Sequence, residues 1–197
     1  MFTSATFRQI AAGLRMLIVL TVLVGAGYPL AVWGVGQIAM RHQAEGSQLT
    51  RSGTVVGSAL IGQAFTTPQW FHGRPSASDY DPTTTGGTNL GPDSPKLVAQ
   101  IEQRRAAIAA EDSVPGTVVT PAQVPADAVT ASFSAVDPYI SPAYAKLQVA
   151  RVARARGLTT TQVAALVAAH TAGRQAGFLG EPRVNVLQLN LALADLR

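Results

Sequence analysis

Few side chains in this 197-residue sequence have the types and spacing that catalysis needs. The absence of cysteine removes thiolate nucleophiles and thiolate metal ligands. The sequence also lacks a GxxxxGKS/T phosphate loop, an HxxxH metal spacing and a GxSxG nucleophile motif. The histidines His42, His72 and His170 are scattered, which is typical of solvated or helix-end positions. These absences predict a protein that is not an enzyme.

Two further classes of ligand are disfavoured by the charged residues. Asp79, Asp81 and Asp93 are close in sequence but lack the alternating oxygen pattern of a calcium loop, so we expect no metal site. The net charge of +4 falls to +2 when Arg8 and Arg15 are set aside, and the remaining basic residues form no long run. We therefore expect no nucleic-acid partner.

The low charged fraction of 13% directs attention to where the apolar residues lie. Residues 16–40 form an uncharged run of 25 residues, MLIVLTVLVGAGYPLAVWGVGQIAM. A helix of this length reaches about 37 Å, which exceeds the roughly 30 Å of a hydrocarbon core. A cleaved signal peptide is the alternative, but its apolar core would be only about 7–15 residues long. We predict a membrane-spanning helix over residues 16–40.

Charge alone leaves the orientation of this span open. Arg8 and Arg15 precede it, and Arg41 and Arg51 follow within the distance that counts for the positive-inside rule. Residues 1–15 are expected to be an N-terminal tail, and residues 41–197 a soluble domain of α/β or α+β class.

Three helices in the soluble domain are marked by capping residues. Proline at the first helical position is favoured after a serine N-cap, glycine ends helices, and a threonine followed three residues later by glutamine forms a capping box. The arginines at 151–156 are expected to form a solvated helix face. The marking residues are Ser94-Pro95, Ser141-Pro142 with Gly157, and Thr159 with Gln162, the last helix ending at Gly173.

The rest of the soluble domain predicts short strands and one long loop. Residues 54–65 suggest a short strand, and residues 115–142 a strand-and-turn segment. Residues 183–197 alternate leucines with other side chains, which suits a core strand; a short helix starting near Asn185 is the alternative. Residues 70–95 are dense in turn formers and predict an ordered surface loop.

Several short strings occur in collinear order over nearly the whole chain. The first are Tyr28-Pro29-Leu30, Gly57-Ser58, Leu60-Ile61-Gly62-Gln63 with Phe65, and Trp70-Phe71 followed by Gly73-Arg74-Pro75-Ser76. The later ones are 86–92 (GGTNLGP), Asp137-Pro138 with Ile140-Ser141-Pro142, Gln148 with Arg151-Val152-Ala153-Arg154, and 180–187 (GEPRVNVL) with Leu189-Asn190.

Taken together, these strings resemble the KdpC family, the C subunit of bacterial Kdp potassium-transporting P-type ATPases. The resemblance implies a non-catalytic subunit needed for assembly and activity of an ATP-driven potassium uptake pump. It implies as partners a channel-like potassium-translocating subunit, a P-type ATPase subunit, a small single-helix subunit and membrane lipid. It also implies a single-pass protein of the inner membrane with its soluble domain on the outer face.

The family is described as raising the ATP affinity of the ATPase subunit through a transient complex of both subunits with ATP. A domain on the outer face cannot touch cytoplasmic ATP across a hydrocarbon layer of about 30 Å, so a purely allosteric action is the alternative. The resemblance points to residues 130–137 as the segment for a phosphate, with Ser132, Ser134 and Asp137 as candidates. Related chains have glycine where this one has Phe133 and Ala135, and histidine where it has Tyr139, which favours a structural turn over a nucleotide site.

The same strings supply candidates for contact with partner subunits. They lie in the 70–95 loop, which we expect to dock on the channel-like subunit, and near the C-terminus. These candidates are Trp70, Phe71, Arg74, Gly86, Gly87, Asn89, Asn185 and Asn190.

Overall fold

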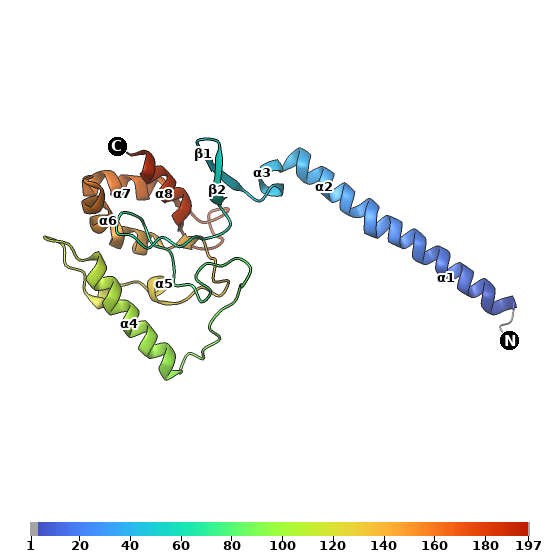
Figure 1. Ribbon diagram of the computed structural model, residues 1–197, viewed down its shortest axis with the longest axis horizontal. Helices are drawn as coiled ribbons and strands as arrows, with labels where there is room; N and C mark the ends of the chain where they lie inside the picture. Colours follow the sequence, from blue (N-terminus) through green and yellow to red (C-terminus); the bar gives the residue numbers. More distant parts are fainter. Residues whose placement is uncertain (1–3, 197) are drawn as a thin grey trace. The chain divides into compact units, whose positions relative to one another are not determined.

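The computed structural model describes residues 4–196, and the chain divides into two compact units, Met1–Gln48 and Leu49–Arg197 (Figure 1). The first unit is an apolar helix followed by a short turn of helix, and the second is a mixed domain of helices and strands. The predicted fold class is therefore confirmed.

The first unit contains one helix long and apolar enough to cross a membrane, Ser4–Ala39. It consists of α1 (Ser4–Val22), a π-helical turn (Leu23–Gly27) and α2 (Tyr28–Ala39), and α3 (Arg41–Ala44) follows. The helix begins well before the expected start of the span at residue 16. No residue of α1 or α2 is buried by the rest of the described chain, so this apolar surface requires lipid or protein around it.

The π-helical turn lies directly before Pro29 and has a physical cause. A proline ring in a helix clashes with the carbonyl four residues earlier, here that of Gly25, and proline has no N–H to donate. In the π turn the N–H of Tyr28 bonds to the carbonyl of Leu23, five residues back. The chain thus accommodates the proline by inserting one residue instead of breaking the helix.

The second unit begins within β1 (Gln48–Arg51), which forms a two-stranded sheet with β2 (Thr54–Ser58). A second sheet has the order β3-β5-β4, all antiparallel, with Tyr139 opposite Asn185 and Thr171 opposite Val184. Its strands are short: β3 (Tyr139–Ile140), β4 (Thr171–Ala172) and β5 (Arg183–Asn185).

Four longer helices enclose the core of this unit (Figure 1). They are α4 (Pro95–Asp112), α6 (Pro142–Arg156), α7 (Thr160–Ala169) and α8 (Val186–Asp195). Short turns, η2 (Pro121–Gln123) and α5 (Ala126–Val129), follow α4. Helix α6 packs against α4 and α7, and both α6 and α8 contact β5. The core residues with no more than 2% exposure include Phe71, Val152, Val163, Val184, Leu189 and Leu193.

The helix starts follow the capping residues. Helix α4 begins at Pro95, the Ser141 hydroxyl accepts from the N–H of Tyr144, and Thr159 and Gln162 form the expected capping box. Gly157 ends α6 in the left-handed conformation, with a φ of 68°. Helix α7 ends at Ala169, before the expected stop at Gly173.

Three expectations about strands need correction. The predicted C-terminal strand is wrong, because only Arg183–Asn185 is strand and residues 186–195 form α8, the helical alternative. Asn190 is buried together with Leu189 and Leu193, so the buried residues recur three to four positions apart, as on one face of a helix. The leucines at every second position gave the sequence the pattern of a strand instead. The predicted strand over 54–65 stops at Ser58, and residues 115–142 contain helical turns and only the short strand β3.

Candidate functional site

A buried ion pair joins α4 to α6. The Nε of Arg151 lies 2.6 Å from Oδ1 of Asp112, and the two side chains are only 4% and 3% exposed. The same guanidinium donates to the carbonyl of Pro68 at 2.7 Å and to that of Trp70 at 3.0 Å. Arg151 therefore fixes residues 67–72, here called the threaded segment, against the helices.

Two amide side chains hold the threaded segment as a neighbouring strand would. Asn190 accepts from the N–H of Phe71 and donates to its carbonyl, both at 2.9 Å. Gln148 accepts from the N–H of His72 at 2.7 Å and donates to its carbonyl at 3.2 Å. Each amide thus supplies the donor and acceptor pair of a sheet neighbour, and the side chain of Phe71 is completely buried.

A second cluster anchors the next stretch of the loop. Arg74 pairs with Asp137 at 2.9 Å and donates to the carbonyl of Thr130 at 3.3 Å. The hydroxyl of Tyr80 donates to the carbonyl of Arg74 at 2.5 Å. Burial, and then the charge of Asp137, raise the pKa of Tyr80 to about 12, so the phenol keeps its proton at neutral pH.

The candidate phosphate segment, residues 130–137, uses its polar groups internally. The N–H of Ser132 donates to the carbonyl of Pro75, and the N–H of Ala135 to the carbonyl of Ser132. The hydroxyl of Ser134 accepts from the N–H of Val136, and Asp137 accepts from the N–H of Tyr139. These contacts make the segment a turn that is hydrogen-bonded to the neighbouring residues 75–76.

A groove of about 520 Å³ lies between residues 72–80 and α4. His72, Arg74, Tyr80, Arg104 and Glu111 contribute its polar lining. The Nδ1 of His72 is 3.4 Å from a carboxylate oxygen of Glu111. The Nε of Arg74 is buried and has no hydrogen-bond partner within the described residues. The groove therefore mixes both signs of charge, while the unpaired Nε of Arg74 is buried and not exposed in it.

Burial governs the protonation of the groups beside this groove. It lowers the pKa of His72 from its ordinary value of 6.5, and the positive charge of Arg151 acts in the same direction. Burial also raises the pKa of Asp112 above its ordinary value, against the opposing hydrogen bond from Arg151. Folding thus favours a neutral imidazole next to the buried ion pair.

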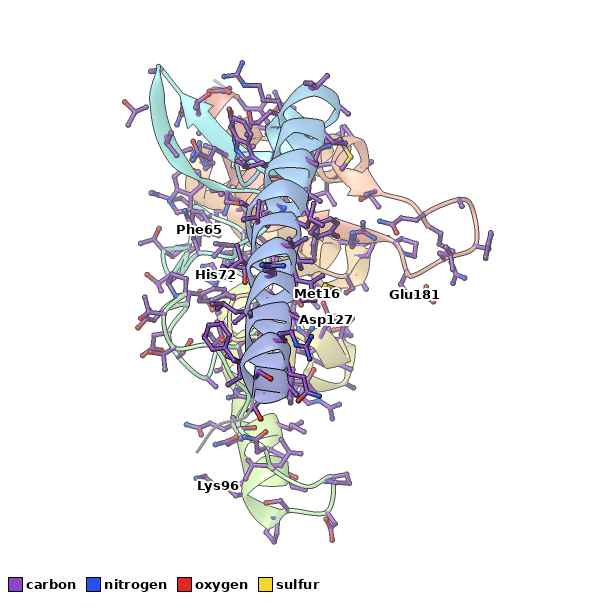
Figure 2. All side chains as sticks on the ribbon, turned by 90° about the vertical axis from the view of Figure 1, so that its right-hand side faces the viewer. Met16, Phe65, His72, Lys96, Asp127 and Glu181 are labelled. Atoms are coloured by element: carbon purple, nitrogen blue, oxygen red, sulfur yellow. The ribbon has the colours of Figure 1, made fainter. Side chains whose placement is uncertain are left out.

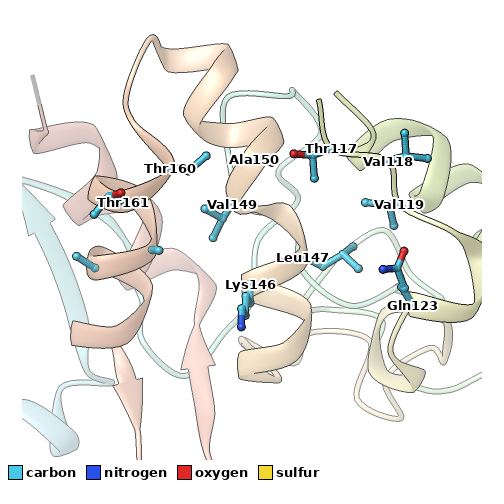
Figure 3. Close-up of a pocket in the computed structure, with 12 residues that line it drawn as sticks. Thr117, Val118, Val119, Gln123, Lys146, Leu147, Val149, Ala150, Thr160 and Thr161 are labelled. Atoms are coloured by element: carbon cyan, nitrogen blue, oxygen red, sulfur yellow. The ribbon is translucent and has the colours of Figure 1, made fainter. Parts of the chain in front are cut away.

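A larger, mainly apolar groove of about 830 Å³ lies between α6, the start of α7 and residues 117–123 (Figure 3). Leu147 and Val149 of α6, the Thr160 end of α7 and Val118 and Val119 line it. Lys146 and Gln123 supply polar groups at its rim. Its lining lacks the convergent charges that would orient a small polar ligand.

The predicted partner-contact residues divide into interior and surface positions. Phe71, Asn185 and Asn190 are buried; Asn185 caps α8 through the N–H of Gln188 and donates to the carbonyl of Ala59. Trp70, Arg74 and Gly87 are half-buried, and Gly86 and Asn89 are exposed. The interior three make internal contacts, which accounts for their presence in the shared strings; contact with a partner stays a prediction for the surface positions.

Similar proteins are numerous, and their names agree. The family described as KdpC, the c chain of the K+-transporting ATPase, matches residues 10–195. A KdpC subunit of a potassium-transporting ATPase from Kineococcus radiotolerans is 54% identical over 94% of this chain and 93% of its own length. KdpC subunits from Gemmatimonas aurantiaca and Mycobacterium tuberculosis are each 50% identical over 96% of this chain, and cover 94% and 99% of their own lengths. The chain belongs to the KdpC family. Its relatives are named as subunits of a potassium-transporting ATPase, which supports an accessory role in such a pump. A helix long and apolar enough to cross a membrane fits this role.

The most connected residue of this KdpC chain was misjudged from the sequence. The arginines at 151–156 were expected to form a solvated face, but Arg151 is 3% exposed and Arg156 lies 4.5 Å from the ring centroid of Trp70. Of these three arginines only Arg154 is exposed. Asp112, at the last turn of α4, attracted no prediction. The Gln148 and Arg151 string, three residues apart on one helix face, was the available signal.

Replacing Asp112 with Asn should destabilise the second unit strongly. The substitution keeps the side-chain shape but leaves the charge of Arg151 buried without its partner, which costs about 3–5 kcal/mol. The free energy of unfolding, measured by denaturant titration of the full chain in detergent with near-UV circular dichroism, should fall by this amount. Glu111→Gln is the matched control, because its side chain is 40% exposed. Equal losses in the two variants would contradict the assigned role of the pair.

Acidification should weaken the second unit through His72. Below its ordinary pKa of 6.5, the unfolded chain gains a proton on His72 before the folded protein does, so the free energy of unfolding falls as the pH falls. In a His72→Gln variant, the drop between about pH 7 and about pH 5 should be smaller than in the unsubstituted chain. His170→Gln, at the end of α7, is the control. An unchanged pH profile in His72→Gln would rule out this contribution.

Proposed function

We propose that this chain is a non-catalytic, single-span accessory subunit of an ATP-driven high-affinity potassium uptake pump, required for assembly and stability of the complex. The relatives' shared name and the long apolar helix support this role. The charged side chains of the threaded segment and its neighbours are engaged in internal structure, with Arg151 on Asp112 and Arg74 on Asp137. Charged side chains that are paired in this way hold the shape of the domain, and a subunit that works by contact with its neighbours needs a fixed shape.

The proposed partners are the channel-like potassium-translocating subunit, the P-type ATPase subunit and the small single-helix subunit of the Kdp complex. The proposed docking element is the 70–95 loop. Its first part is fixed by Arg151, Asn190 and Gln148, so it is pre-organised at little entropic cost on binding. Its second part, residues 81–89, is mostly exposed and has no regular structure. A rigid base with an exposed tip suits recognition by another subunit.

We further propose that the soluble unit lies on the outer face of the inner membrane and acts allosterically, without touching ATP. The observation that carries this proposal is the closed turn at residues 130–137. The N–H groups of Ser132, Ala135 and Val136 are already paired within the chain, so a phosphate would have to displace these bonds. Contact that favours one pump conformation would raise ATP affinity through a coupling free energy alone.

A chaperone action through a transient complex of ATPase subunit, C subunit and ATP is the second candidate. Arg74 and Arg104, which both line the 520 Å³ groove, favour it, because guanidinium groups bind phosphate well. In this candidate ATP is held only transiently, and Ser132, Ser134 and Asp137 stay weak contact candidates.

The side of the membrane on which the soluble unit lies separates the two candidates. The chain has no cysteine, so a single Asn89→Cys substitution gives a unique and exposed label position. A membrane-impermeant maleimide should label it in intact cells, because the outer face is accessible without lysis. A second cysteine variant in the N-terminal tail, Ser4→Cys, should react only after lysis. Labelling of Asn89→Cys only after lysis, together with ATP binding by the purified full chain, would favour the chaperone candidate instead.

Replacing residues 86–91 with a serine segment of equal length should abolish the potassium-dependent ATPase activity of the complex. The serine segment keeps the chain length and the anchor but removes the glycines and Asn89, whose φ is 52°. A shorter serine replacement of residues 115–117, in the exposed turn after α4, should leave activity intact. Full activity of the 86–91 variant in assembled complexes would argue against docking by this loop.

A further inference from the structure

The connection between β4 and β5 is a narrow hairpin that projects from the second unit, near the labelled Glu181 (Figure 2). Gln175 and Leu179 bridge it with two backbone hydrogen bonds of 2.9 Å. The turn between them holds Ala176 and Gly177 at φ values of 50° and 82°, the left-handed conformations of a tight hairpin turn.

The stem of this hairpin is braced on both sides. Arg174 pairs with both carboxylate oxygens of Glu181, at 2.9 and 2.7 Å, across the neck. Beyond the neck, β5 is the central strand of its sheet, and the guanidinium of Arg183 lies 5.0 Å from the ring centroid of Tyr139. The tip is therefore held away from the domain by a defined stem.

The tip itself is apolar and uncovered. Phe178 is 70% exposed and Leu179 is 53% exposed, and glycines with positive φ, Gly177 and Gly180, flank them. The hairpin carries Arg174 and Arg183 against a single acid, Glu181, so its net charge is +1. An aromatic and an aliphatic side chain at the end of a basic stem match the chemistry of a lipid headgroup boundary.

We propose that this tip inserts Phe178 and Leu179 into the interfacial region of the bilayer, as a second membrane attachment of the chain. The apolar helix ends at Ala39 and the second unit begins at Leu49, so the connecting residues span at most about 30 Å. This tether keeps the second unit close to a bilayer surface. The tethered tip meets the bilayer at an effective concentration of about a millimolar, so even a weak insertion is populated.

The size of the tip favours lipid over a protein partner. A stable protein interface buries about 800 Å² on each partner and needs matching shape. Two side chains at a narrow tip cannot provide that area, whereas a fluid headgroup layer closes around any shape. The second attachment would restrict the rotation of the second unit about its linker.

The test uses the full chain in vesicles of phosphatidylethanolamine and phosphatidylglycerol that contain lipid with a nitroxide quencher near the top of one acyl chain. An environment-sensitive dye is attached at Ala176→Cys, which leaves Phe178 and Leu179 in place. The control dye is at Val118→Cys, a position 77% exposed on the turn after α4. We expect at least about twofold stronger quenching at position 176 than at position 118.

The dye's own affinity for lipid is controlled in the same background. Adding Phe178→Ser and Leu179→Ser should remove the excess quenching at position 176, while near-UV circular dichroism stays unchanged because both side chains are on the surface. Equal quenching at positions 176 and 118, or quenching that survives both serine substitutions, would overturn the proposal. A blue-shifted dye without quenching would also overturn it, because the tip would then contact protein.

Discussion

The buried pair of Arg151 and Asp112 is the constraint on which the second unit depends. A guanidinium that is 4% exposed must have its charge and its donors satisfied, and here one carboxylate, one amide and two loop carbonyls do so. The carbonyls belong to a segment with no strand neighbour, so the ion pair substitutes for a sheet in fixing it. Trp70 then lies against Arg156, and the buried Phe71 joins the core, with its backbone held by Asn190. A loop dense in turn formers thereby becomes part of the interior.

The features that sequence predicted well are those determined by a few neighbouring residues. Serine-proline starts, the capping box and Gly157 act within one helical turn, so their positions follow from local chemistry. The buried polar residues failed for the opposite reason. Whether Arg151 faces water or a carboxylate depends on Asp112, 39 positions away, and whether Asn190 belongs to a core stripe depends on a loop 119 positions away. The polarity of Asn190 made the C-terminal segment resemble an alternating strand. Only the contact of Asn190 with the distant Phe71 explains why the buried stripe of this segment is helical.

The candidate site was predicted in the same uneven way. The shared strings include residues 70–76 and 137–142, and the structure brings these two stretches together through Arg74 and Asp137. Their motif character comes from internal bonds: Ser76 donates to the carbonyl of Ala135, and Gly62 lies so close to the carbonyl of Asp137 that a Cβ there would be 2.5 Å away. Strings shared across a family can therefore preserve a turn as readily as a binding site. Because these strings maintain turns, the proposed role of the chain rests on contact surfaces and not on reacting side chains.

The π turn in the apolar helix has a consequence for how that helix meets its neighbours. The inserted residue rotates every later side chain by about 100° around the helix axis. A stripe of side chains on one face before the turn therefore continues on a different face after it. Thr21 and Leu30 consequently do not lie on the azimuths that an unbroken helix would give them. A single span thus presents one lateral surface in its first half and a differently oriented one in its second. Two different helices, approaching from separate directions at different membrane depths, could each pack against its own half.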